Sequence, residues 1–173
     1  GFTDGAAKEV KDALLSLKNN KSAKGIVLDL RENPGGLLRE AVDIVNLFVE
    51  KGQDIVFTKG KVKDWDKTYK TLNNPVDLNI PLTVLVNKGS ASASEIVSGS
   101  LQDLDRAIII GQRTYGKGLV QQTRPLTYGA QLKVTVAKYY VPSGRCIQAL
   151  DYSHRSDDGS VDNVPDSLIT AFK

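Results

Sequence analysis

Apolar residues along the chain follow two alternating periods, one typical of buried strands and the other of amphipathic helices. Short apolar runs with the length of buried strands occupy residues 25–30, 82–87 and 107–111. Apolar residues recur at helical spacing over residues 3–19, 37–50 and 91–104. Strands that alternate with helices in this order predict an α/β domain with a mostly parallel central sheet.

The second half of the chain changes to a strand-and-turn pattern. Residues 119–123 and 131–141 are strand-like, and Tyr128-Gly129 between them is typical of a turn. We therefore expect a hairpin near the C-terminal end of the domain. Residues 1–150 are predicted to form the folded core, and the polar residues 151–173 a loose extension.

Composition narrows the class of protein. The chain has 173 residues, which suits one domain, and its formal net charge is only +3. The lysine-rich segment 51–70 alone has a net charge of +3, and its interleaved apolar residues indicate the solvated face of a hairpin. The basic surface is too small to indicate a nucleic-acid partner. Cys146 is the only cysteine, so an internal disulfide is not possible.

Ser92 is the first candidate for chemistry. It falls where the strand that ends near Asn87 gives way to a helix, and a helix N-terminus favours a negatively charged serine oxygen. The neighbouring Ala91 and Ala93 are small enough to let a substrate backbone come close. The alternative is that Ser90, Ser92 and Ser94 only cap the helix and fill space.

A base for such a serine is not available from histidine. The only histidine, His154, lies in a polar, acidic stretch with no apolar periodicity around it. Lys117, between two glycines, is the substitute, but it has to be desolvated before it can accept a proton. The apolar runs 108–110 and 119–120 are expected to supply that environment. The alternative is an exposed loop lysine.

The sequence Asn-Pro-Gly-Gly at residues 33–36 also allows two interpretations. Adjacent glycines after a buried strand can present backbone N–H groups to an oxyanion, because no side chain blocks the approach. They can equally form a tight turn.

Four blocks of sequence, in this order, closely resemble the C-terminal processing peptidases, also called tail-specific proteases. The blocks are residues 28–36, 90–96, 111–121 and 139–145, and the resemblance extends over residues 1–148. It implies a serine peptidase with a Ser/Lys dyad on a crotonase/Clp-protease-like core of ββα units.

The resemblance also implies a role for individual residues. Ser92 corresponds to the nucleophile, Lys117 to the general base and Gln121 to the glutamine that supports the lysine. The backbone N–H groups of Gly36 and Ala93 correspond to the oxyanion hole. No metal ion or organic cofactor is implied. Glu32 departs from the family pattern, which often has an uncharged polar residue there.

Family resemblance further implies a substrate class and a cellular setting. The expected reaction is cleavage of proteins near apolar C-terminal tails through an acyl-enzyme, in a bacterial envelope or periplasm. The peptide-binding PDZ domain that usually precedes this core is absent from residues 1–150. Two alternatives stay open: a non-catalytic module that binds a peptide or hydrophobic ligand, and a crotonase-type acyl-CoA enzyme. The second alternative gives Ser92 and Lys117 no role.

Overall fold

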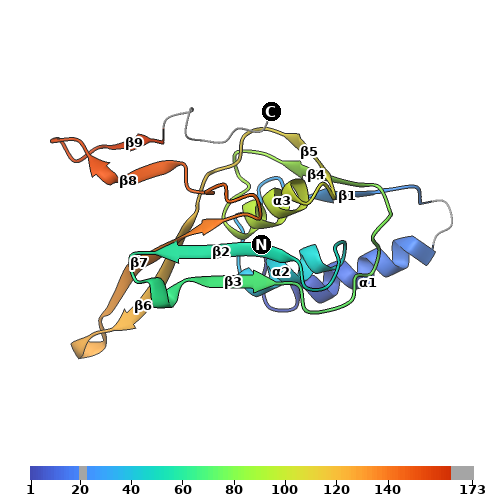
Figure 1. Cartoon of the computed structure of the whole chain (residues 1–173), viewed down its shortest axis with the longest axis horizontal. Coiled ribbons are helices and arrows are strands. Elements are labelled where there is room, and N and C mark those ends of the chain that lie inside the picture. Colours follow the sequence, from blue (N-terminus) through green and yellow to red (C-terminus); the bar gives the residue numbers. More distant parts are fainter. Residues whose placement is uncertain (20–22, 165–173) are drawn as a thin grey trace.

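The computed structural model describes residues 1–19 and 23–164, and it contains three α-helices and nine strands in that part of the chain (Figure 1). The helices are α1 (Ala6–Asn19), α2 (Leu38–Asn46) and α3 (Ala93–Asp103). The strands are β1 (Ile26–Asp29), β2 (Asp54–Gly60), β3 (Lys67–Lys70), β4 (Leu82–Val86), β5 (Ile108–Gly111), β6 (Leu119–Pro125), β7 (Gln131–Tyr140), β8 (Leu150–Arg155) and β9 (Val161–Asn163).

A three-stranded parallel sheet in the order β1-β4-β5 forms the centre of the domain. Leu82, Val84 and Val86 of β4 are buried, and they belong to one apolar cluster with residues of all three helices. Alternate residues of a strand face opposite sides of a sheet, so these three side chains lie on the helix-covered face. The predicted α/β core with a parallel sheet is confirmed.

A second, antiparallel sheet has the order β3-β2-β7-β6. The lysine-rich segment forms the β2–β3 hairpin, and β6 and β7 form the predicted hairpin with its turn at Thr127–Gly129. Tyr128 adopts a positive φ of 58° in that turn. The far end of the β6–β7 hairpin projects from the body of the domain (Figure 1).

The C-terminal part of the described chain is a further antiparallel hairpin, β8–β9. His154 lies in β8, but its side chain and residues 165–173 are outside the described part of the chain. The expectation of a loose extension over residues 151–173 stays a prediction. No helix in residues 1–19 and 23–164 is long and apolar enough to cross a membrane.

Candidate active site

Ser92 occupies the sharp turn between β4 and α3. The strand ends at Val86, the helix begins at Ala93, and Ser92 is the N-cap residue with φ 56° and ψ −115°. A residue other than glycine in such a conformation costs about 1–3 kcal/mol and persists only where its surroundings hold it. Backbone strain of this kind is frequent at functional sites, including the strand-to-helix turns that expose a nucleophilic serine.

The three serines of this turn have different surroundings. Ser90 Oγ donates to Leu30 O at 2.7 Å, and Ser94 Oγ donates to Asn33 O at 3.0 Å. Ser90 and Ser94 are buried, so these two serines have the structural role that was the alternative for all three. Ser92 is half-buried, and its hydroxyl donates no hydrogen bond to any residue that the structure describes.

The predicted oxyanion-hole residues lie at one junction. Gly35 and Gly36 have φ of 91° and 151°, and a β-carbon built on Gly35 would lie only 2.7 Å from Ala93 N. The backbone of the glycine loop therefore lies directly against the Ser92 turn. Within the described chain, the N–H groups of Gly36 and Ala93 donate no backbone hydrogen bond. Neither N–H group is therefore used by the backbone hydrogen bonds of the described fold.

Glu95 joins the serine turn to the lysine loop, and it was not among the predicted site residues. The residue is buried, with 5% of its surface exposed. Oε2 accepts hydrogen bonds from the backbone N–H groups of Ser92 (2.7 Å) and Lys117 (2.9 Å). Oε1 accepts from Thr114 Oγ1 (2.7 Å) and Gly116 N (2.6 Å).

One sequence signal could have identified Glu95. It stands three residues after Ser92, and serine followed at this spacing by glutamate is the pattern of a capping box. A capping glutamate usually lies on the surface of a helix. Here the same carboxylate also holds a loop 19 to 22 residues further along the chain, as the hydrogen bonds from Thr114, Gly116 and Lys117 show.

The backbone of Lys117 is held by the hydrogen bond to Glu95, and the lysine side chain is exposed. No hydrogen bond joins Lys117 Nζ to Ser92 Oγ in the part of the chain that the structure describes. The expectation of an apolar wall around this lysine is wrong for this structure. Ile108 and Ile110 are 68% and 53% exposed, because they lie on the face of the parallel sheet that the helices leave open.

Gln121 lies on β6, four residues after Lys117, and its side chain is exposed. A different glutamine, Gln148, is buried beside the lysine loop. Its Oε1 accepts a hydrogen bond from Gly118 N at 2.8 Å, while Ala149 N donates to Gly116 O at 3.0 Å. Hydrogen bonds within the described chain thus fix the backbone on both sides of Lys117.

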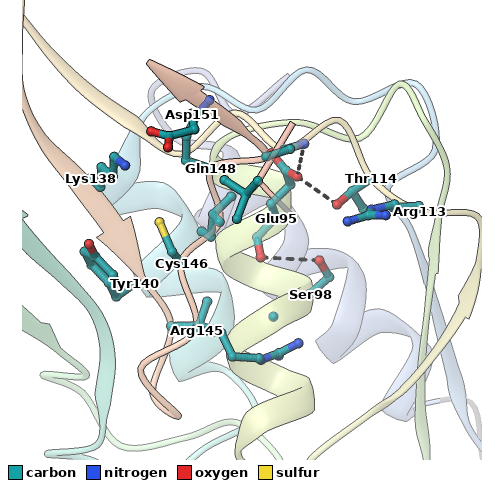
Figure 2. A pocket seen from close by; sticks show the side chains of 16 residues that line it. Glu95, Ser98, Arg113, Thr114, Lys138, Tyr140, Arg145, Cys146, Gln148 and Asp151 are labelled. Carbon is teal, nitrogen blue, oxygen red and sulfur yellow. Dashed lines mark hydrogen bonds between the residues drawn. The ribbon is translucent and has the colours of Figure 1, made fainter. Parts of the chain in front are cut away.

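A cavity of about 310 Å³ lies on another side of Glu95. Figure 2 shows Glu95 and Thr114 at its wall, with Tyr140, Cys146 and Arg145 across it. Ser92 and Lys117 are not among the residues that line it. The cavity is therefore separate from the predicted dyad, although both adjoin the same carboxylate.

Comparison with known proteins assigns the family. The model of peptidase family S41 matches residues 1–152, so the chain belongs to peptidase family S41. A "Probable CtpA-like serine protease" of Staphylococcus aureus is 44% identical over 148 residues, which are 84% of this chain and 29% of that protein. A "Carboxyl-terminal-processing protease" of Synechocystis is 44% identical over 149 residues, 86% of this chain and 34% of that protein.

A solved structure supports the same fold. The photosystem II D1 C-terminal processing protease superposes with a TM-score of 0.77 at 38% identity, over 85% of this chain and 37% of that one. The resemblance to C-terminal processing peptidases is confirmed. The chain spans about a third of the length of these relatives.

Proposed function

We propose that this chain is the core of a serine endopeptidase in which Ser92 is the nucleophile and Lys117 the general base. The observation that carries the proposal is the shared acceptor, since the backbone N–H groups of Ser92 and Lys117 both donate to Glu95 Oε2. The distance between the two nitrogens therefore cannot exceed the sum of these two hydrogen-bond lengths. A nucleophile and a base that act together need such proximity.

The proposed chemistry begins with neutral Lys117. Its Nζ accepts the proton of Ser92 Oγ while the oxygen forms a bond to the carbonyl carbon of a peptide. The N–H groups of Gly36 and Ala93 donate to the oxyanion that develops. The C–N bond then breaks, and Lys117 returns the proton to the departing amine.

Hydrolysis of the acyl-enzyme completes the cycle. Water adds to the ester carbonyl and gives a proton to Lys117, and that proton returns to Ser92 Oγ as the acid is released. Because Lys117 is exposed in this structure, its side chain has to turn toward Ser92 first. Gln121 is proposed to orient the lysine once it has turned.

The substrates that we propose are proteins cut near apolar C-terminal tails, with a cell envelope or periplasm as the setting. Support comes from two relatives, one named as a carboxyl-terminal-processing protease and the other as a D1 C-terminal processing protease. Each name describes the relative itself, and this chain covers only part of each.

The test uses the full-length protein with a protein substrate and a fluorophosphonate that reacts with activated serines. Ser92→Ala and Lys117→Met should each lower hydrolysis by at least about a thousand-fold, and the double variant should be little worse because the pair acts as a unit. Lys88→Met is the matched control, since Lys88 is also an exposed lysine, close to the serine turn. Normal turnover in Lys117→Met would overturn the assignment of the base.

The same experiment tests the non-catalytic alternative. A binding module would retain substrate without cleaving it, and Ser92→Ala would change neither binding nor labelling. Labelling that persists in Ser92→Ala would likewise overturn the assignment of the nucleophile.

A further inference from the structure

Strand β6 is an open edge of the antiparallel sheet. The sheet order β3-β2-β7-β6 leaves one side of β6 without a partner strand among the described residues, and residues 121–125 are exposed. The opposite edge, β3, is only four residues long and contains Lys67 and Lys70. Short edges with lysines resist pairing with other chains. β6 has seven residues, and its first five, residues 119–123, include no charged residue and no proline, so this part of the edge remains able to pair.

The backbone hydrogen bonds of β6 show which residues face outward. At its start, Tyr139 N donates to Gly118 O at 2.8 Å, and just past its end Leu126 N donates to Ala130 O at 2.8 Å. Gly118 and Leu126, which are both even-numbered, therefore direct backbone hydrogen-bonding groups toward β7. The register shift near Val120 places the extra residue in β7, so the alternation along β6 is unbroken.

Odd-numbered residues of β6 consequently direct their backbone N–H and C=O groups away from the sheet. These residues are Leu119, Gln121, Thr123 and Pro125. The position of Pro125 agrees with this orientation, because a proline in a sheet is tolerated where its missing N–H would face outward.

The outward side of β6 is continuous with the candidate active site. Lys117 is also odd-numbered, and its N–H group points away from β7. It donates to Glu95 Oε2, the oxygen that also accepts from Ser92 N. A chain that follows the outer edge of β6 toward its beginning therefore reaches Lys117 and Ser92.

We propose that the polypeptide substrate binds as a fifth strand on the outer edge of β6, with its scissile carbonyl carried to Ser92. This inference rests on the proposed peptidase function and adds how the substrate is held. Extended peptides commonly bind by adding to an open sheet edge, with main-chain hydrogen bonds giving affinity. From Lys117 to Thr123 the strand offers about 20 Å of edge, enough to pair roughly six residues. Recognition through main-chain hydrogen bonds would depend little on the side chains of the substrate.

The first test removes one outward N–H group from β6 in the full-length protein. Thr123→Pro deletes that donor and leaves the hydrogen bonds to β7, while Thr123→Ala is the matched control that keeps it. We expect kcat/KM for a protein substrate to fall about ten-fold in Thr123→Pro and less than about two-fold in Thr123→Ala. Labelling of Ser92 by a small fluorophosphonate should be unchanged in both. Equal turnover in the two variants would overturn the proposal.

The second test leaves the protein unchanged and modifies the substrate. Single backbone nitrogens of the substrate are methylated in turn, at positions three to six residues from the scissile bond, in the part of the peptide that is expected to pair with β6. Because alternate residues of a strand face the same neighbour, kcat/KM should fall about ten-fold at every second position and stay within about three-fold at the others. Uniform tolerance, or uniform loss, would contradict pairing with β6.

The two proposals fail in different ways. If Ser92 is not a nucleophile, fluorophosphonate labelling and hydrolysis do not depend on Ser92. If hydrolysis depends on Ser92 but neither Thr123→Pro nor N-methylation has the expected effect, the peptidase function stands and the β6 docking site is wrong.

Discussion

Replacing Glu95 by glutamine should loosen the serine turn and the lysine loop together. This buried carboxylate is the acceptor in all four of its hydrogen bonds. The donors are the backbone N–H groups of Ser92, Gly116 and Lys117 and the hydroxyl of Thr114. A glutamine amide can accept through its oxygen alone, because its nitrogen is a donor. In Glu95→Gln, one pair of these donors therefore faces an NH₂ group.

The less damaging orientation of the new amide sets the magnitude. With the amide oxygen at the position of Oε2, the bonds from Ser92 N and Lys117 N remain, and the hydroxyl of Thr114 can rotate to accept from the NH₂ group. Gly116 N is then a buried donor without an acceptor, which costs about 1–3 kcal/mol. Losing the charge on the remaining bonds adds to this cost, because bonds to charged groups contribute about 1 kcal/mol more than neutral ones.

Urea unfolding and fluorophosphonate labelling measure the two effects separately. We expect Glu95→Gln to lower the free energy of unfolding by about 2–4 kcal/mol and to slow labelling of Ser92 by at least about ten-fold. Thr114→Val, which removes one donor and leaves the carboxylate charged, is the control and should cost about 1 kcal/mol. A Glu95→Gln variant with wild-type stability and labelling rate would refute the role given to this carboxylate.

Three further predictions concern the framework of the domain, and urea unfolding checks each. Gly35→Ala should cost about 2 kcal/mol or more, against about 1 kcal/mol for Gly52→Ala, because both have positive φ but only Gly35 has backbone atoms in the way. The pKa of the Asp77 carboxyl is lowered to about 2, mainly by the hydrogen bond from Lys18. A carboxyl with a lowered pKa stabilises the fold above about pH 4, and this stabilisation is lost as the pH falls toward 2. The difference in unfolding free energy between wild type and Asp77→Asn should therefore shrink over that range. Arg106→Lys should cost about 2–3 kcal/mol, because the guanidinium donates to three backbone carbonyl oxygens that a lysine cannot reach together.

Periodicity was sufficient to predict the framework, because it reflects burial directly. Each of the predicted helices and strands of the parallel core is present within a few residues of its expected bounds. Ser92 could be proposed because its place between a strand and a helix is readable from the same pattern. The strain at Ser92 could not, since a positive φ in a serine depends on how the glycine loop and Glu95 hold the turn.

Side-chain surroundings were harder to predict than elements. The run 108–110 is apolar enough for a strand buried on both faces, yet Ile108 and Ile110 face an open side of the sheet. Period alone does not reveal which face of a parallel strand is covered. Glu95 and Gln148 were missed for a related reason. The capping-box spacing marks Glu95 as a helix cap. Local patterns carry no signal of the bonds that Glu95 and Gln148 accept from backbone N–H groups of residues distant in sequence.

Fixing the backbone of Lys117 while leaving its side chain exposed gives the site a particular dependence on substrate. Glu95 already holds Lys117 N close to Ser92 N. If Lys117 is the base, its Nζ has to approach Ser92 Oγ, and ordering the lysine side chain costs at most about 2 kcal/mol of rotamer entropy. What the described structure does not supply is a dry environment that favours the neutral amine. A substrate strand on the outer edge of β6 would lie next to Lys117 and exclude water from it. Under the proposed mechanism, the bound peptide would itself supply the desolvation that proton transfer from Ser92 to Lys117 requires.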